Sequence, residues 1–159
     1  MDFQKLQETC EAEEQKYRFA KFSRQDSLDL LLIMNEQAKR FQDPVGIAIT
    51  INGLLVAQFF QDGSMPDSAL WLKRKHNTVD LHQHSSLWAY AWLQNLGETP
   101  EDRKLDVKAH AFGGGGFPIH IEGVGVIGSI CVSGLPNHFD DHQLILDSMD
   151  VFNKTIEGK

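Results

Sequence analysis

Two tight-turn signals, each lying between two apolar runs, constrain the fold of this chain most. Asn52-Gly53 is the strongest short hairpin signal, because a two-residue type I′ turn needs positive φ at both central positions. Glu122-Gly123 repeats the arrangement later in the chain. We therefore expect two β-hairpins that form one antiparallel sheet. The four predicted strands are residues 45–51, 54–60, 117–121 and 124–132.

The apolar residues outside these runs recur at helical spacing. Leu31, Met34, Ala38 and Phe41 mark one such face, and Pro44 prevents the helix from continuing. Long amphipathic helices have to cover the faces of the sheet, which predicts a single α+β domain over residues 1–159. The predicted helices are residues 3–18, residues 27–41 capped by Asp26, Asp67 to about His76, a second piece ending near Gly97, and residues 139–156.

Composition and charge limit the classes of partner that this chain is expected to bind. The chain has 159 residues, 42% of them apolar, which is enough to bury the core of one domain. Its net charge of −7 disfavours nucleic acid and anionic membrane surfaces. We expect no membrane helix, because no apolar stretch approaches about 20 residues. The acidic start lacks a secretory h-region and there are only two cysteines, so we expect a cytoplasmic protein with reduced thiols.

The glycine run Gly113–Gly116 is the most unusual local feature. Consecutive glycines can present several backbone N–H groups to an anion, and they let the backbone approach a flat ligand. The run is neither a P-loop nor a dinucleotide fingerprint, because no Lys-Ser/Thr follows it and it precedes a strand. A tightly bent start of the hairpin is the alternative interpretation. We predict ligand contacts from Gly114, Gly115, Gly116 and Phe117.

Charged side chains and histidines give further candidates. Arg74 and Lys75 close a short predicted helix, where cations suit the helix dipole, and they could also clamp an anionic group. His138 and His142 have the i, i+4 spacing of zinc ligands, but Pro136-Asn137 predicts that His138 lies outside the helix. We therefore predict no metal site, although His142 can still line a pocket. No GxSxG motif is present, so a hydrolase is not supported.

Four blocks of sequence carry a resemblance to a known family. PVGIAITING, PDSALWLKRK, GGGGFPI and VIGSICVSGLP with the following DDH together resemble a largely uncharacterised branch of the haem-degrading, HbpS/GlcG-like family. The resemblance runs from about residue 17 to the last helix. It implies a profilin-like fold, an antiparallel sheet of two hairpins covered by long helices. It also implies homo-oligomers and, for some members, binding of haem or iron.

One position departs from the pattern of that branch. A histidine is expected directly before the glycines that lead into Phe-Pro-Ile, but Gly113 stands there and the nearest histidine is His110. Because CxxCH is absent, any haem would be held non-covalently, with His110, His120 or His142 as axial donor.

Three functional hypotheses follow. The first is a homo-oligomer that binds haem or another small anionic ligand. The second is a protein-interaction or scaffold subunit without a small ligand. The third is an enzyme, ranked last because spacing identifies neither an acid/base pair nor a metal triad. The residues predicted to contact the ligand are Arg74, Lys75, His110, Gly114, Gly115, Gly116, Phe117 and His142.

Overall fold

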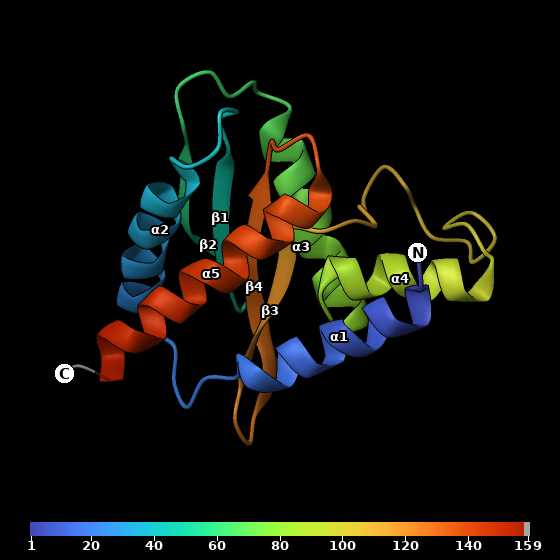
Figure 1. The fold of residues 1–159 in the computed structure, drawn as a ribbon, viewed down its shortest axis with the longest axis horizontal. Coiled ribbons are helices and arrows are strands. Elements are labelled where there is room, and N and C mark those ends of the chain that lie inside the picture. The colour runs from blue at the N-terminus through green and yellow to red at the C-terminus, as the bar shows by residue number, and fades with distance from the viewer. Residues whose placement is uncertain (158–159) are drawn as a thin grey trace.

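The structure is a computed structural model that describes residues 1–157, and its elements follow the predicted order (Figure 1). The helices are α1 (Phe3–Lys16), α2 (Arg24–Ala38), α3 (Ser68–His82), α4 (Ser86–Leu96) and α5 (His138–Glu157). The strands are β1 (Gly46–Ile51), β2 (Leu54–Phe60), β3 (Gly116–Ile121) and β4 (Gly125–Ser133).

The four strands form one antiparallel sheet in the order β2-β1-β4-β3, which confirms the predicted α+β fold with two hairpins. The central pairing of β1 with β4, from Gly46 opposite Ser133 to Ile51 opposite Gly128, joins the hairpins. In the first turn Asn52 and Gly53 both have positive φ, 50° and 82°, as a type I′ turn requires.

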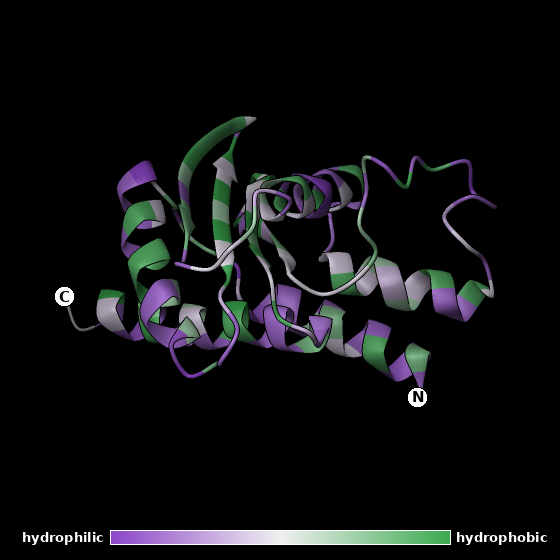
Figure 2. Ribbon diagram, turned by 90° about the horizontal axis from the view of Figure 1, so that it is seen from above, coloured by the Kyte–Doolittle hydropathy of each residue, from purple (hydrophilic) through white to green (hydrophobic). Residues whose placement is uncertain are grey.

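Helices cover both faces of the sheet (Figure 2). Helices α2 and α5 pack over the bulky face, where Ile47 and Ile49 of β1 belong to the main core. Helix α3 lies on the opposite face against small side chains, among them Ala48 and the buried Cys131. Helices α1 and α4 pack against each other on the β3 side (Figure 1). The alternation of large and small residues along β1 thus decides where a helix can approach closely.

Several predicted helix boundaries were wrong. Helix α2 is capped by Ser23 instead of Asp26: the Ser23 side chain accepts the Asp26 N–H, and the Asp26 carboxylate accepts the Ser23 N–H. Asp26 is therefore the inner member of a capping box. Helix α3 continues past His76 to His82, because Thr78 and Val79 remain on its buried face. The chain turns at Gln83, with φ of 60°, before α4 begins.

Helix α5 begins at His138, so this histidine lies in the first turn and not outside the helix as predicted. The preceding Asn137 acts as the cap, since its side chain accepts the Phe139 N–H at 3.0 Å.

The interior glycine of β4, Gly128, has a local cause. A Cβ at Gly128 would collide with the Thr50 carbonyl of β1, so a neighbouring strand makes the close approach there, and not a helix or a ligand.

Within residues 1–157, no helix is both long enough and apolar enough to span a bilayer.

Candidate functional site: a pocket beside the glycine run

A pocket of about 760 Å³ lies between α3, the loop that joins α4 to β3, and the start of α5. Its walls are mainly apolar, and polar groups gather where α3 faces α5. The apolar and aromatic lining comes from Pro44, Met65, Trp71, Pro100, Val107, Phe112 and Leu135, and the polar lining includes Ser64, Ser68, Lys75, His110, Ser133, His138 and Asp141.

The glycine run divides into two environments. Gly113 and Gly114 line the pocket, whereas Gly115 and Gly116 do not. A Cβ at Gly115, where φ is +118°, would meet the Val132 carbonyl and would lie 2.6 Å from Lys75 Nζ. The Gly116 N–H donates to Ser86 Oγ at 2.9 Å. The protein itself therefore fills the space beside the second half of the run. A Cβ at Gly114 would likewise collide with the His138 carbonyl, so the first half borders the pocket with its backbone.

Lys75 and Asp141 form a buried ion pair on the pocket wall. Lys75 Nζ donates to Asp141 Oδ2 at 3.0 Å and to the Val132 carbonyl at 2.7 Å, and the Leu135 N–H donates to Asp141 Oδ1 at 3.3 Å. Burial raises the pKa of Asp141 to about 6, and the Lys75 charge opposes that rise. Asp141 thus compensates the charge of Lys75 within the protein.

Arg74 points to a different part of the molecule. Its Nε donates to the Lys108 carbonyl at 2.9 Å, and its guanidinium lies 4.7 Å from the centre of the Trp71 ring. Because consecutive residues on a helix point about 100° apart, Arg74 and Lys75 do not meet on one ligand. The structure does not bring the two predicted cations together as a clamp.

Two pocket histidines have tautomers that their hydrogen bonds decide. His110 Nδ1 lies 2.9 Å from the Asp106 carbonyl, which can only accept, so Nδ1 carries the proton and Nε2 keeps its lone pair. His138 Nδ1 accepts the Gly114 N–H at 2.8 Å, which places the His138 proton on Nε2. Burial lowers the pKa of His138 and favours this neutral ring. His110 is thus the pocket histidine with a nitrogen available to a metal centre.

Phe117 and His142 lie away from the pocket. Phe117 is buried in the main core, and its ring centre lies 5.9 Å from that of His142. His142 Nε2 lies 2.9 Å from Glu13 Oε1 on α1. Since His138 bonds to Gly114 and His142 to Glu13, these two histidines do not form a zinc pair.

The sequence reasoning missed several lining residues. Asp141 was not among the predicted ligand contacts, yet it stands four residues before Ile145 and eight before Met149, both fully buried. That spacing places Asp141 on the buried face of α5 and was a usable signal. Trp71 and Phe112 were not predicted to line a site, because no local pattern distinguishes a pocket wall from a core.

The comparisons with known proteins identify the family. A family model described as "Haem degrading protein HbpS-like" matches residues 22–150. The chain belongs to this HbpS-like family. The resemblance predicted from the sequence blocks is therefore confirmed.

Curated relatives and solved structures agree with this assignment. The UPF0303 protein SCO2848 of Streptomyces coelicolor is 34% identical over 146 residues, covering 90% of this chain and 92% of the relative. The UPF0303 protein YE1367 of Yersinia enterocolitica is 31% identical over 153 residues, covering 96% of this chain and 90% of the relative. The Ybr137w protein has a TM-score of 0.83 at 30% identity over 92% of this chain and 88% of its own.

More distant structures share the fold alone. HbpS has a TM-score of 0.68 at 20% identity, covering 84% of this chain and 92% of its own. The PduOC:haem complex has a TM-score of 0.69 at 19% identity, covering 81% of this chain and 93% of its own.

Proposed function

We propose that this protein binds a flat, largely apolar ligand in the pocket beside Gly113 and Gly114, with haem as the ligand that the family suggests. The observation that carries the proposal is the hydrogen bonding of His110. Its Nδ1–H donates to the Asp106 carbonyl. The Nε2 lone pair of this pocket-lining side chain is therefore available to coordinate a metal. A hydrogen bond at the other ring nitrogen is the usual way in which a protein orients a metal-binding histidine.

The residues of the pocket fit a macrocycle. A cavity of about 760 Å³ lies within the range of small-molecule sites, and the rings of Trp71 and Phe112 offer flat apolar surface. His138 fills the space that a side chain at Gly113 or Gly114 would take, so these two glycines offer a ligand their backbone on the pocket wall. Since Asp141 compensates the charge of Lys75, acidic groups of a ligand would be met by the hydroxyls of Ser64 and Ser68 or by solvent.

Each part of the site has a role under this proposal. His110 would hold the iron, the Asp106 carbonyl would keep the imidazole in the required tautomer, and Trp71 and Phe112 would exclude water from the ring. Bound haem would supply an iron that takes axial ligands and exchanges electrons. The proposal covers binding and includes no reaction.

A haemin titration tests the proposal. The full chain should shift the Soret band of haemin with one equivalent bound, and His110→Ala should weaken binding at least tenfold. His120→Ala is the matched control, because His120 lines a separate polar hollow formed with α1 residues such as Glu14. No Soret shift at haemin excess would reject haem as the ligand, and an equal loss in both variants would reject His110 as the donor.

A second candidate function, self-association, has its own observation. The edge strand β2 exposes Leu54, Leu55 and Phe59 to 49%, 48% and 43%. We infer that a second copy of this chain covers this edge. Sedimentation should show an oligomer that Phe59→Gln weakens, while Leu81→Gln, at a similarly exposed position on α3, leaves it intact. A monomeric wild-type chain would reject this inference.

A further inference from the structure

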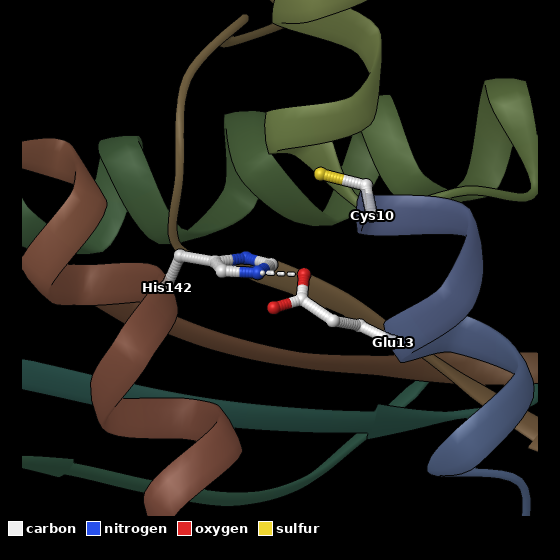
Figure 3. Close-up of side chains that lie close together, drawn as sticks. All are labelled: Cys10, Glu13 and His142. Atoms are coloured by element: carbon white, nitrogen blue, oxygen red, sulfur yellow. Dashed lines mark hydrogen bonds and ion pairs between the residues drawn. The ribbon is translucent and has the colours of Figure 1, made fainter. Parts of the chain in front are cut away.

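Three side chains of metal-binding type converge between α1 and α5. Cys10 and Glu13 come from α1, and His142 comes from α5 (Figure 3). One ligand atom from each residue lies within 4.8 Å of the other two. Glu13 and His142 lie 129 positions apart along the chain, so only the packing of α1 against the rest of the fold assembles the cluster.

The cluster is shielded from solvent but not sealed. Cys10 is fully buried, His142 is 3% exposed, and the Glu13 side chain is 21% exposed. Glu13 also interrupts the apolar face of α1, where packing alone would favour a hydrophobic residue. The only ring nitrogen of His142 with a hydrogen bond is Nε2, while Nδ1 is buried without a partner among the described residues. His142 thus presents Nε2 to Glu13 and has a second buried ring nitrogen without a partner among the described residues.

We propose that Cys10, Glu13 and His142 form a binding site for a divalent transition-metal ion of the zinc type. Thiolate, imidazole and carboxylate are the three ligand classes that Zn²⁺ accepts in proteins. One thiolate and one carboxylate balance a divalent cation, so the loaded site carries no net charge and its burial is not penalised as an isolated ion would be.

The geometry requires only a small adjustment. Zinc bonds of about 2.0–2.3 Å in a tetrahedral arrangement separate neighbouring ligand atoms by about 3.2–3.7 Å. His142 Nε2 and Glu13 Oε1, now 2.9 Å apart, would have to separate slightly, and ligand atoms as far apart as 4.8 Å would have to close by about 1.5 Å at most. Glu13 is the partly exposed member and can move for this purpose. Binding displaces the thiol proton of Cys10 to solvent, and the imidazole keeps one proton on the nitrogen that does not bind.

The exposure of Glu13 also determines the type of site. Structural zinc sites use four protein ligands, whereas three protein ligands leave a position for water or a substrate group. The described residues supply three ligands, and solvent can reach the cluster only on the Glu13 side. The site therefore keeps one exchangeable position. It is separate from the haem pocket, because Asp141 and His142 are neighbours on α5 that bond to α3 and α1 respectively.

Cobalt(II) titration of the full chain, freed of metal by a chelator, tests the proposal. Wild-type protein should bind one Co²⁺ and develop the near-ultraviolet band of a cobalt–thiolate bond, with release of one proton. Cys10→Ser should abolish the band, and Glu13→Gln and His142→Gln should each weaken binding at least tenfold. Cys131→Ser is the matched control, since Cys131 is the other buried thiol and lies in β4.

Two further measurements keep the test decisive. Zn²⁺ should raise the melting temperature of wild type and of Cys131→Ser, and should not raise that of folded Cys10→Ser or Glu13→Gln. His110→Ala should leave Co²⁺ binding unchanged, which separates this site from the haem pocket. A wild-type chain without a thiolate band, or a band that survives Cys10→Ser, would overturn the proposal.

Discussion

Consecutive residues of α5 anchor two buried acid–base pairs that differ in how completely they are satisfied. In the Lys75–Asp141 pair, Nζ has two acceptors and both carboxylate oxygens are used. In the Glu13–His142 pair, one ring nitrogen has no partner among residues 1–157 and a thiol lies nearby. A fully satisfied pair holds two elements in place and offers nothing to a ligand. The less completely satisfied pair, which lies near a thiol, is the one that we propose binds a metal ion.

The largest expected effect comes from breaking the satisfied pair. Lys75→Met leaves the Asp141 carboxylate buried and uncompensated, and should lower the free energy of unfolding by about 3–5 kcal/mol. Chemical denaturation measures it. Lys73→Met, at an exposed position on the same helix, should stay within about 0.5 kcal/mol of wild type. A loss below about 1 kcal/mol in Lys75→Met would show that Asp141 does not depend on its lysine.

The second expected effect comes from a substitution in the glycine run that crowds the Lys75–Asp141 pair. Gly115→Ala places a methyl group against the Val132 carbonyl and Lys75 Nζ, at a backbone φ of +118°. We expect a loss of about 3 kcal/mol in the free energy of unfolding. Gly123→Ala is the control: φ is +75° there with no atom within 4 Å of the added carbon, so about 1 kcal/mol is expected. Equal losses in thermal or urea unfolding would remove the steric argument.

A smaller effect is expected at the second pair. His142→Gln, measured in the presence of a chelator, should cost about 1–2 kcal/mol in the free energy of unfolding. The reason is that Glu13 is partly exposed and can be solvated when its partner is lost. If the loss equals that of Lys75→Met, then this pair is as structural as the other and the contrast between them fails.

The smallest effect concerns a half-buried histidine, His82, that has no ion-pair partner within residues 1–157. His82 packs among Trp88, Trp92 and Phe112, and burial lowers its pKa below 6.5. The unfolded chain therefore binds this proton more readily, so the stability that neutral His82 contributes is present above pH 6.5 and is lost as the pH falls.

The comparison of wild type with His82→Gln measures this effect. Between pH 7.5 and 5.5 the variant should lose less stability than wild type, by under about 1 kcal/mol because the side chain is partly solvated. An NMR titration should place the His82 midpoint below 6.5. A midpoint above 6.5 would contradict the desolvation argument.

The sequence by itself determined the parts of this fold that depend on local chemistry. Asn52-Gly53 specified a hairpin because few residues tolerate positive φ, and Gly97 ended α4 with φ of 66° for the same reason. The alternation along β1 separated its large and small faces before any helix was placed. The combination of blocks around GGGGFPI identified the family.

Only the tertiary structure decided which partner each buried polar group meets. Periodicity shows that a residue is buried, but it does not show which distant element covers it. Lys75 therefore looked like a surface cation until Asp141, 66 residues later, was seen beside it. Half of the glycine run faces protein and half faces a pocket, which no local pattern distinguishes. Glu13 interrupted a helical face for no visible reason, until the fold placed His142 against it, because burial requires each polar group to find a partner.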